Sequence, residues 1–542
     1  MSRWFRSHWP LVLAMVVLLA TMGGLLRISL AENGGRFVYA LDDAYIHMAM
    51  AKNFAQHGVW GVSPEQFSSS SSSMLWVLLL SSVYVIVGVG ELAPYFLNIV
   101  FAAALLFVVY RILVRDRPPS AYVFLTLIVI IFATPLTTLI VSGMEHVLQI
   151  VFTILFVYLS AEYLAKESEE KVHAPRALYV LAPLMTSVRY EGLFVVFVIC
   201  CLLALRRRWG PAFRIGLLSL VPIVLYALIS VSHGWSWLPN SILLKGRFPR
   251  MTSIVAFVNF FDWTIPNFFR SPLPVLYLSL TSLVLLAVGF KRGAGLWNRN
   301  QIIVFVFLSV TFLHLQFSDV GWFFRYEAYL VALGVIAVAL SLLDVFEDWK
   351  QMITSPERVA VLLAVIALFA FFPVRMLTVR AFDAFRESTK AQNDRYFEHI
   401  IPAKFLSTYY SRQTIIVNDL GAVAFFTNAR ILDMYGIGNV EPLRFRQKKN
   451  GYVSSDVSQW ATRDHAKIAV LQVQWPEVAP RIPLDWIPVG EWEIPRNVVF
   501  GDRRIGFFAL DTVEAVSLAQ HLREYSVLVP GRIHQIQYDR QQ

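Results

Sequence analysis

Asp42 and Asp43 form an adjacent carboxylate pair that follows the first long apolar segment of the chain and precedes a short stretch with helical spacing. Buried near a bilayer without partners, such a pair costs on the order of several kcal/mol, so its position marks a candidate functional site. A carboxylate there can accept the proton of a hydroxyl nucleophile, or hold a sugar or a divalent cation. An alternative with equal weight on residue type is that both aspartates only cap and solubilise the following helix.

Connectors later in the chain carry further groups suited to the same chemistry. They supply an acid beside an imidazole, three cations and several aromatic rings, at Glu145, His146, Arg189, Lys245, Arg325, Tyr45, Trp235, Trp237, Trp322 and Tyr326. Transfer of a sugar from a lipid phosphate needs a base near the acceptor hydroxyl and cations that stabilise the departing phosphate oxygens. Aromatic faces suit sugar rings because they are apolar in body and polar at the edge. Each residue alone also fits an ordinary structural role, such as an interfacial anchor or a membrane-interface belt.

The composition places these groups in a membrane protein. Of the 542 residues, 57% are hydrophobic and 15% are charged, against about 45–50% and about 25% in soluble domains. Much of the Lys and Arg behind the net charge of +10 lies in short connectors, as the positive-inside rule requires. No nucleic-acid-binding motif accompanies that charge, so nucleic acid is not an expected partner. The only two cysteines, Cys200 and Cys201, are adjacent in an apolar run and cannot cross-link loops.

The first apolar run, Pro10–Leu30, is longer than the ~7–15-residue core of a cleaved signal peptide. We therefore expect a retained membrane helix with its N-terminus in the cytoplasm, followed by a long first outer loop over residues 31–94. A short amphipathic helix at the outer surface is predicted by the spacing of Ala44, Met48, Ala51 and Ala55. Asp43 occupies the expected N-cap, which leaves Asp42 one residue outside the helix and free to face a ligand. The serine run Ser68–Ser73 is predicted to be a flexible connector.

Further apolar runs occupy about 74–90, 95–113, 121–141, 147–165, 177–188, 192–205, 215–231, 272–290, 301–316, 328–343 and 358–373. An upright span needs about 20 residues, so the short runs must be half-helices or border a water-filled cavity. Positively charged connectors alternate with motif-bearing connectors only if the run 74–90 does not cross the bilayer. We interpret that run as a re-entrant or interfacial helix on the outer side, which gives about eleven crossings and collects the polar motifs on one face. Nucleotide sugars are not supplied outside the cytoplasm, so a lipid-linked donor is the physically available one.

Residues 376–542 differ from the rest in composition. The β-rich runs at 414–417, 467–471 and 505–510 alternate with Gly, Pro and charged segments, which predicts a soluble extracytoplasmic α/β domain after a transmembrane domain at 1–375. Gly421 follows the first strand and is expected to open a helix. The surrounding residues do not form a G-x-G-x-x-G fingerprint, so no nucleotide site is predicted.

Several motifs in a fixed order carry a resemblance to a known family. They are Asp42-Asp43-Ala44-Tyr45-Ile46, a Ser-rich stretch before Met74-Leu75-Trp76, Ser142-Gly143-Met144-Glu145, Arg189-Tyr190-Glu191-Gly192-Leu193, Leu238-Pro239-Asn240-Ser241 followed by Lys245, and Asp433-Met434-Tyr435-Gly436-Ile437. Over about residues 1–440 the chain resembles the GT-C superfamily of polytopic membrane glycosyltransferases. The resemblance is closest to the branch typified by mycobacterial terminal arabinofuranosyltransferases, which use decaprenyl-phosphoryl arabinose.

The resemblance implies an inverting transfer from a polyprenyl-phosphate sugar, with Asp42 as the general base and Asp43 as the second acid of the motif. The acceptor would be an extracytoplasmic glycan, lipid or protein. Candidate substrate-binding residues are Tyr45, Glu145, His146, Arg189, Tyr190, Glu191, Asn240, Lys245, Arg325 and Tyr326. Tyr190 in the Arg-Pro-Glu position and the segment 319–326 depart from the family pattern, which puts the identity of the sugar in doubt. Metal dependence stays open, because two carboxylates and one histidine do not make a diagnostic ligand spacing.

These inferences predict a mainly α-helical, multi-pass protein of the plasma (inner) membrane, with a cytoplasmic N-terminus and an extracytoplasmic C-terminal domain. The alternative of a different class is a transporter or flippase for a lipid-linked or small polar solute, since transporters also use broken helices and intramembrane charges. Transporters commonly show paired repeats with a midplane site, whereas the polar motifs here cluster on one side. A non-catalytic assembly subunit is the third possibility.

Overall fold

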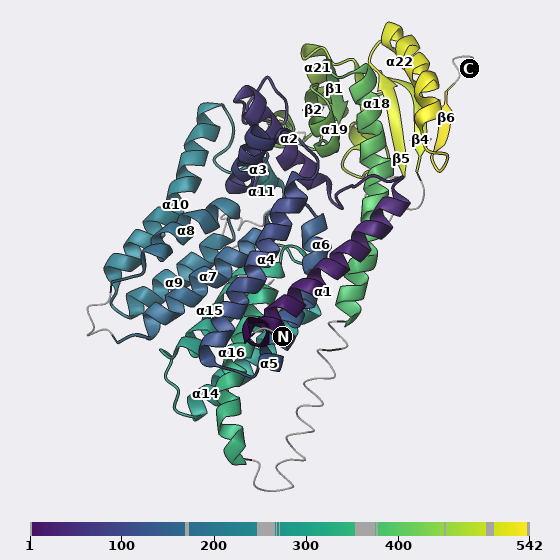
Figure 1. Cartoon of the computed structure of the whole chain (residues 1–542). Helices are drawn as coiled ribbons and strands as arrows, with labels where there is room; N and C mark the ends of the chain where they lie inside the picture. Colours follow the sequence, from purple (N-terminus) through teal and green to yellow (C-terminus); the bar gives the residue numbers. More distant parts are fainter. Residues whose placement is uncertain are drawn as a thin grey trace.

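The computed structural model describes residues 3–167, 173–245, 266, 268–269, 271–352, 374, 378–448, 451–494 and 503–538. Figure 1 shows a large helical part that begins at the N-terminus, with a sheet-containing C-terminal part at one end of it. The predicted domain boundary between residues 375 and 376 lies outside the described residues.

The helical part is long and apolar. Its helices are α1 (Arg3–Glu32), α2 (Asp42–His57), α3 (Met74–Val87), α4 (Ala93–Leu113), α5 (Ser120–Ala133), α6 (Leu136–Val141), α7 (His146–Ala165), α8 (Arg176–Val188), α9 (Gly192–Leu205), α10 (Trp209–Ser232), α11 (Asn240–Lys245), α14 (Leu273–Lys291), α15 (Arg299–Phe317) and α16 (Ala328–Met352). Within the described ranges, seven helices are long and apolar enough to span a membrane: those in α1, α4, α7, α10, α14, α15 and α16. The predicted eleven crossings would also require α5, α8, α9 and the run 358–373, which lies outside the described residues.

The positively charged connectors meet at one end of the bundle. Arg299, at the start of α15, pairs with Asp116 after α4 (Nη2 to Oδ2, 2.5 Å) and with Glu162 in the last turn of α7 (Nη1 to Oε1, 3.2 Å). Arg208, before α10, donates to the carbonyl oxygen of Tyr163 at 2.5 Å. The connectors after α4, α7, α9 and α14 therefore gather together, as the alternation of charge predicts.

The motif-bearing connectors meet at the opposite end. Glu145 precedes α7, and its Oε1 accepts from Arg189 Nη1 at 2.9 Å. Ser318, after α15, donates to Glu191 at 3.4 Å. Because Glu145 and Glu162 lie at the two ends of α7, the division of the connectors into two sets is confirmed.

Helix α3 begins and ends at this same motif-bearing end. Before α3, Ser71 Oγ lies 3.0 Å from His47 Nδ1 of α2. After it, the carbonyl oxygen of Glu91 accepts from the hydroxyl of Tyr39 at 2.6 Å. A helix whose flanking residues both contact the segment around α2 does not cross the bundle, as the charge alternation predicts. Its re-entrant or interfacial position in a bilayer stays a prediction.

Two local expectations in the outer loop are wrong. Helix α2 begins at Asp42 with Leu41 as its N-cap, so Asp43 is not the N-cap; the Asp42 side chain accepts hydrogen bonds from a different helix instead. The run Ser68–Ser73 is not a solvated connector, because all its members except Ser72 are buried. Its hydroxyl groups find partners in distant segments, such as the carbonyl oxygen of Ile437 for Ser70 at 2.9 Å.

The C-terminal part contains one mixed sheet with strand order β2-β1-β3-β5-β4-β6. Strands β2, β1 and β3 run parallel, whereas β3, β5, β4 and β6 pair antiparallel. The bounds are β1 (Thr414–Val417), β2 (Arg430–Asp433), β3 (Ile468–Gln472), β4 (Ile487–Glu493), β5 (Arg504–Ala509), β6 (His534–Gln537), α18 (Ile401–Tyr409), α19 (Gly421–Phe426), α20 (Glu441–Arg446), α21 (Ser454–Arg463) and α22 (Thr512–Tyr525). The three predicted strands and the helix opening at Gly421 are confirmed.

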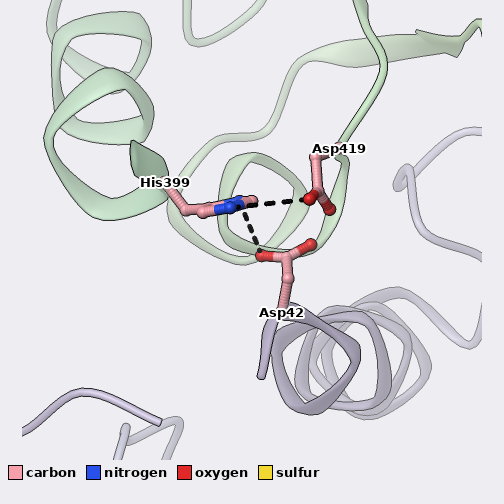
Figure 2. Close-up of side chains that lie close together, drawn as sticks. All are labelled: Asp42, His399 and Asp419. Atoms are coloured by element: carbon pink, nitrogen blue, oxygen red, sulfur yellow. Dashed lines mark ion pairs between the residues drawn. The ribbon is translucent and has the colours of Figure 1, made fainter. Parts of the chain in front are cut away.

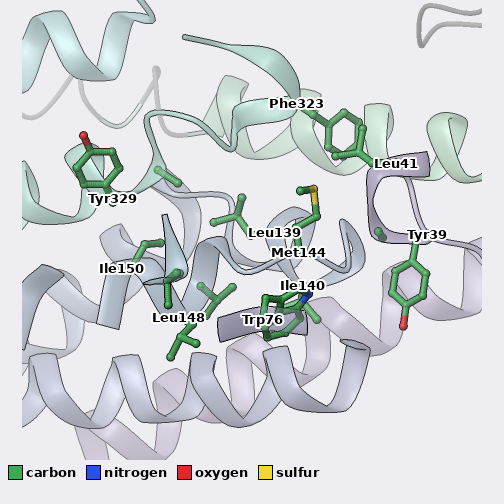
Figure 3. Packing of buried hydrophobic residues seen from close by; sticks show 14 of the residues in the cluster. Tyr39, Leu41, Trp76, Leu139, Ile140, Met144, Leu148, Ile150, Phe323 and Tyr329 are labelled. Carbon is green, nitrogen blue, oxygen red and sulfur yellow. The ribbon is translucent and has the colours of Figure 1, made fainter. Parts of the chain in front are cut away.

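One hydrophobic cluster joins the two parts. It runs from the membrane-type helices through α2 to one face of the sheet, whereas the other face packs against α21. Figure 3 shows a region of it, with Trp76 of α3, Ile140 of α6 and Met144 before α7. Gly143 (φ 70°) lets the α6–α7 turn approach this core, since a Cβ there would lie 2.5 Å from the Tyr39 ring. The continuous core holds α2 between the helical part and the sheet.

Candidate active site

Two cavities meet at Asp43. The smaller, of about 390 Å³, is surrounded by the helical part and is lined by apolar side chains such as Leu193, Phe194 and Phe317; we call it the apolar cavity. The larger, of about 990 Å³, lies between the helical and the C-terminal parts and has a more charged lining; we call it the interdomain cavity. Lys245 lines both cavities, as Asp43 does. A molecule in one cavity can therefore reach a molecule in the other at this point.

Asp43 is paired with two cations at this junction. Its Oδ2 accepts from Arg325 Nη2 at 2.6 Å, and its Oδ1 lies 3.4 Å from Lys245 Nζ. Burial alone would raise the pKa of Asp43, but the charges of Lys245 and Arg325 hold it well below its usual range. Two cations therefore pair with the Asp43 carboxylate where the cavities meet.

Asp42 faces away from these cations, towards the C-terminal part. Its Oδ2 accepts from the backbone N–H of Gly421 at 2.6 Å, and its Oδ1 from that of Ala422 at 2.8 Å, at the start of α19. A Cβ on Gly421 would lie 2.4 Å from the Asp42 Oδ2, so this approach requires glycine. Lys52, further along α2, donates to three carbonyl oxygens at the other end of α19. The expectation that Asp42 lies free outside its helix is therefore wrong, although Asp42 does line the interdomain cavity.

His399 lies between Asp42 and Asp419, as Figure 2 shows. Its Nδ1 is 3.5 Å from Asp42 Oδ1, and its Nε2 is 3.5 Å from Asp419 Oδ2. Burial would lower the pKa of His399, but Asp419, Glu398 and Asp42 raise it to about 10. Burial would raise the pKa of Asp42, but His399 and its other partners hold it well below the usual range. Burial and the Asp42 charge raise the pKa of Asp419. His399 lies in a single π-helical turn, Tyr396–Ile400, an irregularity common at functional sites.

Within the described ranges, one group of side chains has the spacing of a metal site: Asp42, His399 and Asp419, with ligand atoms within 4.8 Å of one another. Arg395 packs beside this group and pairs with Glu398 (3.3 Å) and Asp419 (3.7 Å). Dependence on a divalent cation stays a prediction, and the mechanism below uses only the side chains of this protein.

We expect His399 to stabilise the protein below neutral pH and to lose this effect as the pH rises. Its pKa is about 10 in the fold, against an ordinary value of 6.5, so pairing of the imidazolium with Asp42, Glu398 and Asp419 is fully present below pH 6.5 and is lost towards pH 10. Arg395 is the cation that faces the same cluster. At pH 6, His399→Gln should therefore unfold at a lower temperature, by about 1 °C for each kcal/mol lost in a chain of this length.

Thermal scans of both proteins in the same detergent from pH 6 to pH 10 check this. The difference in Tm should shrink as the pH rises. A difference that stays constant or grows with pH would show that His399 is not the protonated partner of these acids.

Arg189 already has carboxylate partners. It donates to both oxygens of Glu191 (3.0 and 2.7 Å) and to Glu145 (2.9 Å). The ring of Tyr326 lies between this guanidinium (5.7 Å) and that of Arg325 (4.9 Å). The aromatic face stabilises both cations and keeps them in place. Arg189 therefore positions the wall of the apolar cavity, whereas the charge of Arg325 is directed to the junction.

The remaining predicted residues divide between the cavities and their support. Tyr190 and Glu191 line the apolar cavity, and Tyr326 lines both. Tyr45 lines neither cavity: it is 1% exposed and its hydroxyl accepts from the backbone N–H of Tyr39. Glu145 and His146 are fully buried behind the wall, His146 against the edge of the Tyr326 ring.

Asn240 connects the two parts of the chain and lines neither cavity. Its Nδ2 donates to the carbonyl oxygens of Gly436 (2.8 Å) and Asn439 (3.0 Å). It thereby joins α11, which ends at Lys245, to the Asp433–Ile437 motif. Asn240 is thus a residue that positions Lys245 in this structure.

Sequence reasoning missed the C-terminal members of the site. Arg395, Glu398 and His399 belong to a helical segment with no motif of its own, and Trp475 lies in a turn after β3. Asp419 was close to a recognised signal, since it lies two residues before the helix-opening Gly421. Its contact with Asp42 spans 377 residues of sequence, which no local pattern reveals.

Comparisons with known proteins agree with this architecture. Residues 389–513 match a family model described as "Domain of unknown function (DUF8728)". No curated protein matches the chain in sequence. In structure, the chain is similar to ArnT from Cupriavidus metallidurans, in its apo state and bound to undecaprenyl phosphate. Each alignment has a TM-score of 0.52 and 14% identity, over 92% of this chain and 98% of that chain. The chain therefore has an ArnT-like GT-C fold with a C-terminal sheet-containing domain; these two alignments do not show the arabinofuranosyltransferase branch.

Proposed function

We propose that this protein is an inverting membrane glycosyltransferase that moves a sugar from a polyprenyl-phosphate donor to an extracytoplasmic acceptor. The observation that carries the proposal is the pairing of Lys245 and Arg325 with Asp43 where the apolar cavity meets the interdomain cavity, whose lining is more charged. ArnT has been solved with undecaprenyl phosphate, so a polyprenyl phosphate is the first donor class to test. Arabinose is not carried over, because Tyr190 and residues 319–326 depart from that family pattern; the donor sugar is a hexose or a pentose.

The donor lies in the apolar cavity in this proposal. Leu193, Phe194 and Phe317 offer apolar surface to the lipid chain. The phosphate lies at Lys245 and Arg325, the two cations that pair with Asp43. Both residues can donate charge-assisted hydrogen bonds to phosphate oxygens, and a guanidinium can do so with two N–H groups.

Donor binding also frees Asp43. The phosphate competes with the Asp43 carboxylate for the same two cations, Lys245 and Arg325. An Asp43 released from them is closer to its ordinary pKa and available to hydrogen-bond a sugar hydroxyl. When the donor binds, Asp43 therefore changes its partner from the two cations to a hydroxyl group of the sugar.

Asp42 acts as the general base. An in-line displacement places the nucleophile on the face of the sugar opposite the leaving phosphate, and Asp42 lines the interdomain cavity but not the apolar cavity that holds the donor lipid. The acceptor hydroxyl gives its proton to Asp42 while its oxygen forms a bond to the anomeric carbon. The bond from that carbon to the phosphate oxygen breaks, and its electron pair leaves with the polyprenyl phosphate. The low pKa keeps Asp42 ionised, and the hydroxyl becomes more acidic as its new bond forms.

The site lies on the extracytoplasmic side of the plasma (inner) membrane in this proposal. The connectors rich in Lys and Arg gather at the other end of the bundle, which the positive-inside rule assigns to the cytoplasm. In this proposal the N-terminus is cytoplasmic and the C-terminal domain is extracytoplasmic.

Donor cleavage tests the proposal. The full-length protein in nanodiscs is incubated with synthetic hexosyl and pentosyl polyprenyl phosphates and a cell-envelope extract, and mass spectrometry follows the lipid. We expect release of polyprenyl phosphate matched by a new glycoside of inverted anomeric configuration. A protein that cleaves none of these donors, or that moves a lipid or solute across liposomes without cleavage, would contradict the proposal and favour the transporter or flippase.

A further inference from the structure

The interdomain cavity holds an aromatic stack that the donor chemistry does not use. The rings of Tyr435 and Trp475 lie parallel, with centroids 5.3 Å apart and planes 21° from each other. The guanidinium of Arg446 lies 5.8 Å from the centre of the Tyr435 ring. Both aromatic residues line the interdomain cavity and are only partly buried.

The helical part also contributes an aromatic residue to the lining of the interdomain cavity. Trp322, just before Arg325, is 37% exposed and lines the interdomain cavity but not the apolar one. Exposing the apolar surface of a tryptophan to water at a cavity wall is unfavourable in free energy. A ligand with an apolar face that covers this ring removes that cost. The cavity therefore offers aromatic surface from both parts of the chain.

The polar groups of this cavity carry mixed charge. Its described lining contains five acids and three bases: Asp42, Asp43, Asp319, Asp419, Glu477, Lys245, Arg395 and Arg503. A strongly anionic polymer would meet more negative than positive charge there, so it is disfavoured. Carboxylates and amides such as that of Gln474 are instead suited to the hydroxyl groups of a neutral ligand.

The size and position of the interdomain cavity further restrict the class of ligand that fits it. A volume of about 990 Å³ lies at the upper end of the ~300–1,000 Å³ range of small-molecule sites. The cavity reaches Asp42 and Asp43, where transfer takes place in the proposed function. An acceptor that reaches from the aromatic stack to these acids therefore contacts the cavity well beyond its reacting hydroxyl group.

We propose that the acceptor is a neutral glycan, one ring of which lies on Trp475 of the Tyr435–Trp475 stack while its terminal sugar presents a hydroxyl group to Asp42. Sugar rings have an apolar C–H face that packs on aromatic rings and a rim of hydroxyl groups that the acids and amides bind. This inference rests on the proposed function and specifies its acceptor. A lipid acceptor would have its apolar part in a cavity of mixed charge, and a peptide acceptor is the alternative that the test includes.

Glycan binding can be measured without the donor. The full-length protein in nanodiscs is titrated with immobilised panels of neutral oligosaccharides and of Ser/Thr peptides. We expect wild type to bind at least one oligosaccharide, Trp475→Ala to weaken that binding by about tenfold, and Trp475→Phe to keep it within about threefold. Trp237→Ala is the matched control, because Trp237 is 61% exposed and lines neither cavity.

Native mass spectrometry with added undecaprenyl phosphate accompanies the titration. Retained lipid binding in Trp475→Ala shows that the donor site is intact. The inference is overturned if wild type binds only peptides or no oligosaccharide, or if Trp475→Ala binds the oligosaccharide as wild type does. Absence of lipid binding and of donor cleavage in wild type would instead contradict the proposed function, so the two failures are distinguishable.

Discussion

Replacing Asp42 by asparagine should lower the turnover number by about 10²–10⁴-fold, the contribution typical of a general base. The amide cannot accept the proton of the acceptor hydroxyl. Donor affinity should change little, because Asp42 does not line the apolar cavity and contacts neither Lys245 nor Arg325 in the described contacts. Initial rates at saturating donor, together with the Kd for a polyprenyl phosphate, measure the two effects separately.

The same substitution also disturbs a structural contact, so it needs a matched control. Asp42 binds the first N–H groups of α19, and Lys52 binds three carbonyl oxygens at its other end, from Ala424, Phe425 and Thr427. Lys52→Met keeps an unbranched apolar stem but removes these three hydrogen bonds. It therefore weakens the docking of α19 on α2 without removing a carboxylate from the cavity.

The two variants together decide the role of Asp42. If Asp42 is the base, Lys52→Met should retain turnover within about tenfold while Asp42→Asn does not. Equal losses in both variants, with matching falls in Tm, would show that Asp42 acts only by docking the C-terminal domain. Wild-type turnover in Asp42→Asn would remove it from the chemistry altogether.

The double role of Asp42 shows what local sequence can and cannot predict here. The helix after Asp42 was predictable, because the spacing of its apolar residues and the acidic pair are local signals. The direction of the Asp42 side chain was not, because its partners, Gly421 and Ala422, lie 379 and 380 positions away. Only the packing of α19 on α2 determines which of two adjacent acids faces the phosphate cations.

For the serine run, in contrast, the local signal itself gave the wrong prediction. Low complexity predicts a flexible, solvated segment, yet Ser69 lies between Tyr226 of α10 and Ser230, and its carbonyl oxygen accepts from Asn240. Small hydroxyl side chains let several segments approach closely and bind one another's polar groups. Composition alone does not distinguish a serine-rich segment that is exposed to solvent from one that is buried among polar groups of other segments.

The large-scale organisation was more accessible than the site. Charge alternation between apolar runs predicted that α3 would not cross, because membrane insertion sorts Lys and Arg independently of tertiary contacts. β-Branched runs predicted β1, β3 and β5 in the C-terminal part for the same reason: the signal is local. The cluster of Arg395, Glu398 and His399 had no such local signal. Its role follows only from contacts with Asp42 and Asp419, which lie in other segments of the chain.

Removing Arg325 should weaken binding of the donor phosphate by about 10–100-fold, the loss expected for charge-assisted hydrogen bonds. Arg325→Met keeps much of the apolar stem but leaves Lys245 as the one cation that pairs with Asp43 among the described residues. Arg325→Lys should recover part of the affinity, because it restores the charge without the planar fork. The Kd of undecaprenyl phosphate in nanodiscs, compared across the three proteins, measures the effect.

Asp43→Asn should change the same affinity in the opposite direction. In the resting protein the Asp43 carboxylate competes with the phosphate for Arg325 and Lys245. Removing its charge leaves both cations without that competitor, so undecaprenyl phosphate should bind about tenfold or more tightly, even though turnover falls. The retained charge on Arg325 distinguishes this variant from Arg325→Met, which has one cation fewer.

These opposite signs separate an exchange of partners from a merely structural ion pair. A structural pair would lose stability in either variant, and lipid affinity would fall in both or stay unchanged. If Asp43 and the phosphate share the two cations, the double variant Asp43→Asn/Arg325→Met should bind the lipid with an affinity between those of the single variants. Weaker binding in Asp43→Asn, in a protein that keeps its wild-type Tm, would contradict the assignment of Lys245 and Arg325 as the phosphate site.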